Sequence, residues 1–368
     1  MNSEVGIWQV LPHLPGSNDG VGDYALTLAR QLSVAHGMRT TFVVAASTSV
    51  REKEEFPVVS GLHLPAAASS AAVPAHVILH YANYGYQSRG VPFQLLRFAR
   101  DLRGRTAGRW ITTFHELYAS GPPWRSAFWV RPFQVKIARD LMDLSSSCVV
   151  SNEVIKNEIA RHNPRQPVHV VPVMSNFGEP PVGALAAKSL KRWAVAGGTA
   201  LIERSLRAFA RVQSLIPAAY FPDEVEVIGG IDNRLVRDRL QMLRDSVPSI
   251  SFRHHPQVDV ETASTLLASC AFGWLDYFGT GKVWPGMILK SGSFAAFCAH
   301  GIVPILSHAE ATLAAGGNPF PGPYYITTAV TKLPEPEKLM QTQQAVRAWY
   351  DRNASSARTA AVYAEAFK

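Results

Sequence analysis

Short apolar runs alternate with amphipathic stretches along almost the whole chain. In the first half the apolar runs predict β-strands at Val5–Val10, Thr41–Ala46, Val77–Tyr81, Trp110–Phe114, Cys148–Val150 and Val168–Val173. Between them, apolar residues at helical spacing predict helices at Asp23–Ala35, Phe93–Leu102, Phe128–Leu144 and Asn152–Arg161. This alternation is typical of parallel α/β sheets that carry helices on both faces.

The same alternation restarts in the second half. Strands are predicted at Trp193–Ala196, Val225–Ile228, Ser249–Arg253, Ala271–Leu275, Val303–Leu306 and Tyr324–Thr327. Helices are predicted at Ala200–Leu215, Ile231–Ser246, Glu261–Ser269, Phe294–His300, Glu335–Tyr350 and Ser355–Phe367.

A stretch without any period separates the halves, and 368 residues are too many for one ordinary core. We therefore predict an N-terminal domain at residues 1–175, a linker at 176–191 and a C-terminal domain at 192–350. Residues 351–368 form a last helix that we expect to pack on the first domain.

Charge and cysteine content narrow the function classes. The net charge of +8 favours contact with phosphates, in a nucleotide, a nucleic acid or an anionic membrane. The basic residues are dispersed and no recognition module appears, so we do not expect a nucleic-acid partner. Three cysteines, all within apolar runs, indicate buried thiols rather than disulfides or metal ligands. No apolar run is long enough to span a membrane and no signal peptide is apparent, so we expect a cytoplasmic protein.

Two glycine turns stand between a predicted strand and a predicted helix. The first is G-V-G-D-Y at Gly20–Tyr24, and the second is the pair Gly197 and Gly198 at the start of the other half. Glycine lets the backbone approach a ligand, and a helix N-terminus attracts anions. Both turns are therefore candidate phosphate or substrate sites, although glycine at such a place also serves the turn alone.

The richest segment is D-Y-F-G-T-G-K-V-W-P-G-M-I-L-K-S-G-S at Asp276–Ser293. It follows an apolar strand and precedes a helix, so we expect a long loop at the carboxyl edge of the second sheet. Lys282 and Lys290 bring positive charge, and Ser291 and Ser293 can cap the helix start. A plain capped helix start is the alternative interpretation.

These features together resemble the GT-B glycosyltransferases, especially the retaining family-4-like group. The local matches are G-V-G-D-Y-A-L-T-L-A-R-Q-L, T-F-H-E at Thr113–Glu116 and K-S-G-S-F-A-A-F-C-A-H-G-I-V-P-I-L at Lys290–Leu306. The resemblance covers nearly the whole chain as architecture. It implies an α/β GT-B fold in which two Rossmann-like domains face each other across a cleft, with the acceptor on the first domain and a nucleotide-sugar donor on the second.

The resemblance also implies roles in the first domain. His115 follows a strand, where such enzymes place a histidine that contacts a sugar. A histidine at a strand end can also be purely structural, but the local match favours a sugar contact. Glu116 either accepts a hydroxyl hydrogen bond or is simply solvated. Gly20 and Gly22 would bring backbone N–H groups to the donor phosphates or the acceptor. Asp23 is a helix N-cap or an acceptor contact, and we favour the cap.

In the second domain, the resemblance places the donor diphosphate at Gly197 and Gly198. The family's arginine slot is glycine here, and the nearest cations are Arg204 and Arg207, slightly out of register. Arg204 either pairs with a phosphate or is simply solvated or ion-paired. Two glutamates that the family carries in this region are also missing, since the corresponding positions fall near Ile288 and Ala296, and neither residue is acidic. Asp276 replaces that carboxylate or serves as a turn residue.

We therefore expect a glycosyltransferase that uses a nucleotide-sugar donor, needs no cofactor or metal and acts on a glycan or lipid-linked acceptor. The alternatives are a nucleotide-sugar epimerase or hydrolase on the same fold, and a catalytically silent binding protein. Donor base, sugar, acceptor and stereochemistry are not predicted. Aromatic and basic residues interleave at Pro122–Arg139, so one hypothesis is peripheral contact with an anionic membrane. The alternative, which we weigh somewhat more heavily, is that several of these aromatics belong to the core, because a helix in this fold needs an apolar face for its own sheet.

Overall fold

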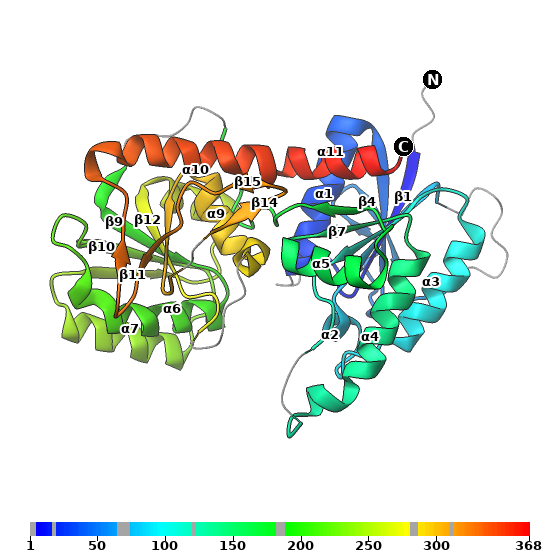
Figure 1. The fold of residues 1–368 in the computed structure, drawn as a ribbon, viewed down its shortest axis with the longest axis horizontal. Helices are drawn as coiled ribbons and strands as arrows, with labels where there is room; N and C mark the ends of the chain where they lie inside the picture. The colour runs from blue at the N-terminus through cyan, green and yellow to red at the C-terminus, as the bar shows by residue number, and fades with distance from the viewer. Residues whose placement is uncertain are drawn as a thin grey trace. The chain divides into compact units, whose positions relative to one another are not determined.

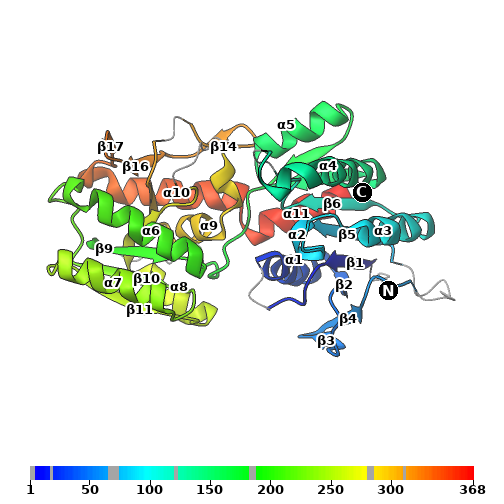
Figure 2. The same cartoon turned by 90° about the horizontal axis from the view of Figure 1, so that it is seen from below.

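Each half of the chain folds around its own parallel sheet, because strands that are apolar on both faces need helices on both sides. The computed structural model describes residues 5–16, 20–64, 74–119, 123–181, 188–279, 286–309 and 312–368. The chain divides into a first unit, Met1–Val171 with Ser356–Lys368, and a second unit, Pro172–Ser355 (Figure 1, Figure 2).

The first unit contains an eight-stranded sheet in the order β3-β4-β2-β1-β5-β6-β7-β8. All neighbours pair in parallel except β3 and β4, which are antiparallel. The strands are β1 (Val5–Leu11), β2 (Met38–Val44), β3 (Glu52–Lys53), β4 (Phe56–Ser60), β5 (His76–Tyr81), β6 (Trp110–Phe114), β7 (Ser147–Val150) and β8 (Val168–Val170).

Helices cover both faces of this sheet. α1 (Gly20–His36) and α11 (Ser356–Ala366) lie together on one face, although they come from opposite ends of the chain (Figure 1). The other face carries α3 (Phe93–Arg105), α4 (Ser126–Leu144) and α5 (Glu153–His162), while the short α2 (Asn83–Tyr86) follows β5. The last helix of the chain is thus part of the first unit.

The second unit contains a seven-stranded sheet in the order β11-β10-β9-β12-β13-β16-β17. Its strands are β9 (Ser189–Ala196), β10 (Glu224–Ile228), β11 (Ser251–His255), β12 (Cys270–Leu275), β13 (Val303–Leu306), β16 (Tyr324–Ile326) and the antiparallel β17 (Thr331–Lys332). A separate hairpin pairs β14 (Ala314–Ala315) with β15 (Asn318–Pro319).

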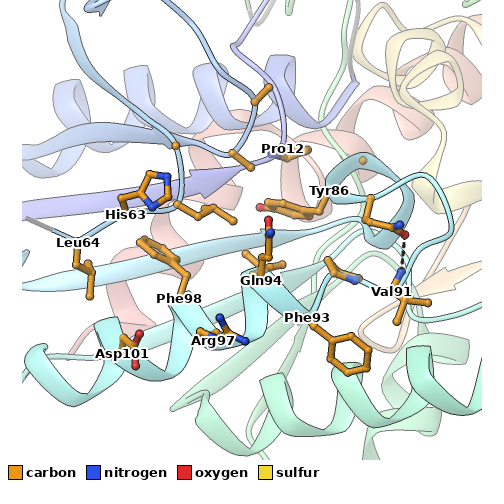
Figure 3. Close-up of a pocket in the computed structure, with 18 of the residues that line it drawn as sticks. Pro12, His63, Leu64, Tyr86, Val91, Phe93, Gln94, Arg97, Phe98 and Asp101 are labelled. Carbon is orange, nitrogen blue, oxygen red and sulfur yellow. Dashed lines mark hydrogen bonds between the residues drawn. The ribbon is translucent and has the colours of Figure 1, made fainter.

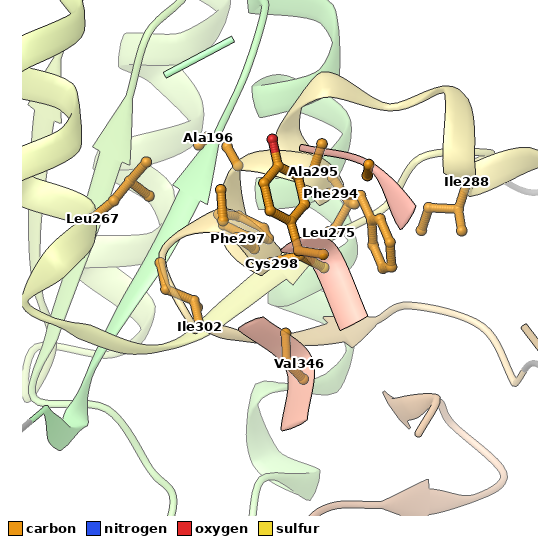
Figure 4. Packing of buried hydrophobic residues seen from close by; sticks show 14 of the residues in the cluster. Ala196, Leu267, Leu275, Ile288, Phe294, Ala295, Phe297, Cys298, Ile302 and Val346 are labelled. Atoms are coloured by element: carbon orange, nitrogen blue, oxygen red, sulfur yellow. The ribbon is translucent and has the colours of Figure 1, made fainter. Parts of the chain in front are cut away.

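Two apolar cores sandwich the second sheet. α6 (Thr199–Val212) and α7 (Arg234–Ser246) pack on one face. α8 (Val260–Ala268), α9 (Gly292–Ala299) and α10 (Leu339–Asn353) pack on the other, where Phe294, Phe297 and Cys298 meet Val346 of α10 (Figure 4). All three cysteines of the chain are buried and unpaired, as predicted.

The predicted α/β architecture is confirmed, and most element ends shift by only a few residues. The sequence analysis missed β4, because Pro57 lies within the run and a proline argues against an interior strand. The structure accommodates it near the sheet edge, where β4 pairs with β2 and the two-residue β3. β9 begins at Ser189, within the segment expected to be linker.

Candidate functional site

The strand order of the first unit marks a ligand-binding edge. The chain passes from β1 to β2 on one side and later to β5 on the other, so the crossovers reverse between β1 and β5. Such a reversal leaves a crevice outside the carboxyl ends of the strands, where ligands of open α/β sheets bind. His115 directly follows β6, which pairs with β5, and its N–H donates to the Tyr81 carbonyl at 3.0 Å. Its predicted place at the edge is confirmed.

His115 contacts the buried side chain of His80, which in turn contacts Gln9. Nε2 of His115 lies 3.2 Å from Nδ1 of His80, whose Nε2 lies 2.8 Å from Oε1 of Gln9. The Tyr24 ring stands edge-on to both imidazoles, with centroids 5.8 Å and 5.1 Å away. His80 is fully buried, and this burial, followed by the charge of His115, holds the pKa of His80 well below its usual value. The sequence analysis singled out neither His80 nor Gln9.

The other predicted residues of this unit lie around α1 and after His115. Glu116 is exposed, and Gly20 is the exposed first residue of α1. Gly22 is buried, and a Cβ there would lie 3.0 Å from Cα of Pro15, so close packing accounts for that glycine. Asp23 is the fourth residue of α1, so the prediction that it is the N-cap was wrong. Its carboxylate lies in the first turn, where the helix dipole favours negative charge.

A groove of about 870 Å³ opens at the same edge of the first unit. One wall is α3, which supplies Phe93, Arg97 and Phe98, while the loops after β1 and β4 supply Pro12 and His63 (Figure 3). The groove therefore combines aromatic faces with hydrogen-bonding groups. We did not predict it. The sequence gives one indication of it: the α3 residues that line the groove recur at helical spacing, next to the α3 residues that are buried in the core.

The second unit repeats the reversal between β9 and β12, which are neighbours in the classic doubly wound order. The predicted glycine turn follows β9. Gly197 has φ of +134°, and a Cβ there would lie 2.5 Å from the Ser293 Oγ. Glycine is thus needed at position 197 both for its backbone angle and for its contact with Ser293. The fold brings these two predicted residues together.

The start of α9 presents polar groups at this edge. Ser291 is the N-cap, and its hydroxyl accepts a hydrogen bond from the Phe294 N–H at 3.3 Å. Capping therefore accounts for Ser291 without a ligand. Lys290 is half-buried, and no other described residue forms a hydrogen bond or ion pair with its ammonium. Asn176 also reaches this helix start, because a Cβ on Gly292 would lie 2.6 Å from its side chain. The sequence analysis had counted Asn176 as linker.

Arg204 and Asp276 organise the loop after β12. The Arg204 guanidinium donates to the carbonyls of Asp276 and Tyr277 at 2.7 Å and 2.6 Å. The carboxylate of Asp276, which is 1% exposed, accepts from the Gly279 N–H at 3.0 Å and from the Ser307 hydroxyl at 2.8 Å. Both side chains are therefore committed to protein partners. Lys282 lies outside the described residues.

The two positions of the missing family glutamates are core positions in this fold. Ile288 and Ala296 are 2% and 0% exposed and pack within the apolar cluster around α9, where Figure 4 shows Ile288. A glutamate at either position would be buried in this apolar cluster, so its carboxylate could not reach a ligand at the sheet edge. Among the residues that the structure describes, no group of three or more His, Cys, Asp or Glu side chains is arranged to hold a metal ion. No helix in the described ranges is long and apolar enough to cross a membrane.

Two doubly wound α/β units of this kind in one chain define the GT-B fold. No family model and no curated protein matches the sequence. Solved structures are similar: a glycosyltransferase from Rickettsia africae ESF-5 is 11% identical, with a TM-score of 0.58 over 99% of this chain and 98% of its own. The catalytic domain of starch synthase IV from Arabidopsis thaliana, bound to ADP and acarbose, is 10% identical, with a TM-score of 0.55 over 100% and 99%.

An epimerase has the same architecture. UDP-GlcNAc 2-epimerase from Methanocaldococcus jannaschii is 10% identical, with a TM-score of 0.50 over 98% of both chains. At these identities the likeness establishes the fold, which glycosyltransferases and related epimerases share.

Proposed function

We propose that the protein is a glycosyltransferase that moves a sugar from a nucleotide-sugar donor, bound by the second unit, to an acceptor bound by the first. The observation that carries the proposal is the close approach of Gly197 to Ser293 at the carboxyl edge of the second sheet, where Lys290 directly precedes the N-cap of α9. A close backbone turn, a helix N-terminus and an ammonium group together suit a diphosphate. The fold of known glycosyltransferases supports the same conclusion.

The donor site needs no metal in this proposal. As the sugar–phosphate bond breaks, negative charge develops on the leaving diphosphate, and Lys290 and the α9 N-terminus are placed to stabilise it. Charge-assisted hydrogen bonds of this kind contribute roughly 1.5 to 3 kcal/mol each. We assign Arg204 and Asp276 to the loop rather than to the phosphates, because their polar atoms already have protein partners.

The acceptor is assigned to the groove of the first unit and to His115. Phe93 and Tyr86 offer apolar faces for a sugar ring or a lipid, and His115 and Glu116 offer polar atoms for a hydroxyl. A glycan and a lipid-linked acceptor both fit this chemistry.

An exposed aromatic surface favours the lipid-linked acceptor. Four aromatic side chains just before α4 and in its first turns are exposed, so the alternative that they are core is wrong. They are Trp124, Phe128, Trp129 and Phe133, which are 84%, 40%, 68% and 52% exposed. The cations Arg125, Arg131 and Lys136 are exposed among them. Aromatics at headgroup depth beside cations make a peripheral anchor, and each cation adds about 1 kcal/mol on anionic lipid. Phe93 of the groove contacts Phe133, with ring centroids 6.3 Å apart, so the surface borders the groove.

The membrane proposal is tested by co-sedimentation with vesicles of phosphatidylcholine and phosphatidylserine at low salt. We expect binding that is lost when Arg125, Arg131 and Lys136 are together replaced by glutamate. A matched variant with Arg234, Arg237 and Lys332 replaced by glutamate makes the same charge change on exposed residues of the second unit and should still bind. Absence of wild-type binding, or equal binding by both variants, would contradict the proposal.

Transfer itself is tested with the His115→Ala variant. Nucleoside diphosphate release is measured with and without candidate acceptors, which separates transfer from hydrolysis. We expect turnover to fall at least about tenfold while the protein stays folded, with a loss of stability of roughly 1 to 3 kcal/mol because the buried His80 loses its hydrogen-bond partner. An unchanged transfer rate would remove His115 from the site. Release without an acceptor would favour the hydrolase or epimerase alternative, and nucleotide-sugar binding without turnover would favour a silent binding protein.

A further inference from the structure

A continuous chain of side-chain contacts runs through the interior of the first unit to His115. Nε2 of Gln9 donates to Oγ1 of Thr40 at 3.2 Å, and Oε1 of Gln9 lies 2.8 Å from Nε2 of His80. Nδ1 of His80 in turn lies 3.2 Å from Nε2 of His115. Thr40, Gln9 and His80 are all buried, at 2%, 0% and 0% exposure. The chain therefore links three neighbouring strands, β2, β1 and β5, to the residue that follows β6.

The contacts fix the position of each proton. Because the Gln9 amide nitrogen donates to Thr40, its oxygen faces His80 and can only accept. His80 Nε2 must then carry a proton. Burial keeps His80 neutral, so its Nδ1 has none and accepts a hydrogen bond. The partner of that nitrogen is Nε2 of His115, which must therefore be the donor.

We propose that Gln9 and His80 are positioning residues that hold His115 with a proton on Nε2, which fixes the ring at the edge to which the acceptor is assigned. The acceptor rests on the function proposed above, whereas the proton on Nε2 rests on the contacts alone. In a neutral imidazole the bond made by one nitrogen decides which role the other can take. Among the described residues, the phenolic ring of Tyr24 in α1 packs edge-on to both imidazoles, and its hydroxyl lies 3.3 Å from that of Tyr363 in α11.

The proton positions are measured directly by ¹⁵N NMR of histidine-labelled full-length protein, because protonated and bare ring nitrogens have separate shifts. Assignment uses the single variants His80→Phe and His115→Ala. At neutral pH we expect a proton on Nε2 of both residues and a bare Nδ1 in His80. A proton on Nδ1 of His80, or a bare Nε2 of His115, would overturn the proposal. This readout needs no substrate, so failure of the proposed function leaves it valid.

Two variants test the positioning role. Gln9→Leu removes the acceptor, and His80→Phe keeps the ring but removes both nitrogens, so each should let His115 populate both tautomers. The kcat for transfer should fall about tenfold in both while nucleotide affinity is unchanged. Tyr24→Phe keeps the ring against both imidazoles and should leave the tautomer of His115 as in wild type. If Gln9→Leu and any folded His80→Phe protein retain the wild-type His115 spectrum and kcat, the residues are merely structural and the proposal falls.

Discussion

The strand order reverses in the same way in the two units, but the residues at the carboxyl edges of the two sheets differ in their chemistry. At the edge of the first unit, the His115 side chain is oriented by its contact with His80 and by the Tyr24 ring that packs edge-on to it. The second unit supplies backbone and charge, with a glycine turn against Ser293 and a helix N-terminus beside Lys290. A neutral hydroxyl needs oriented donors and acceptors, whereas a diphosphate needs N–H groups and positive charge. The comparison supports the proposal that the acceptor binds at one edge and the donor at the other.

A second comparison concerns the buried histidines. His300 of the second unit is as buried as His80, but its Nδ1 bonds to the Ala296 carbonyl and its Nε2 to the Ser264 hydroxyl, both at 2.8 Å. These contacts fasten the end of α9 and reach no described cavity. Burial of a histidine alone therefore does not mark a site. What distinguishes His80 is that its second nitrogen bonds to a residue at the sheet edge.

The largest effect that we expect is a difference in stability between alanine variants of Gly197 and Gly198, the two neighbouring glycines at the edge of the second sheet. Gly197→Ala forces a side chain onto a backbone at φ +134° and against Ser293, and we expect it to lower the free energy of unfolding by roughly 3 to 4 kcal/mol. Gly198→Ala is the matched control, because φ is −72° and no atom lies within 4 Å of the added Cβ. Chemical unfolding measures both. Equal stabilities would show that the close approach of Gly197 to Ser293 is absent in solution.

The next effect is pH-dependent and tests the structural role of His300. Burial lowers the pKa of His300 to about 4, so the neutral form is favoured in the folded protein and the unfolded chain takes up the proton first. Stability that is present above the unfolded pKa is therefore lost as pH falls toward 4. Between about pH 7 and 4, wild type should lose about 3 kcal/mol more than His300→Gln. Parallel stability curves for the two proteins would contradict this assignment.

Much of the fold was predictable because parallel strands leave continuous apolar runs, and Trp110–Phe114 and Val303–Leu306 have the predicted ends. Gly197 and Ser293 were also predicted, since a turn and a helix start are local signals. The partnership of Gln9 with His80 was not, because it depends on the register of β1 and β5, which no local pattern fixes. The resemblance offered Arg204 and Asp276 as donor residues, with a solvated or ion-paired arginine and a turn aspartate as the alternatives. Their commitment to loop carbonyls and hydroxyls appears only in the folded chain.

The most direct test of the account is calorimetric titration of the full chain with ADP, UDP, GDP and their glucose conjugates. We expect at least one nucleotide to bind, and Lys290→Ala to weaken it at least tenfold with an unchanged melting temperature, because a single charge-assisted bond to phosphate exceeds about 1.4 kcal/mol. Lys332→Ala, on the exposed β17 of the same unit, should bind like wild type. Failure of every nucleotide to bind, or equal affinity in Lys290→Ala and wild type, would contradict a diphosphate site at the start of α9.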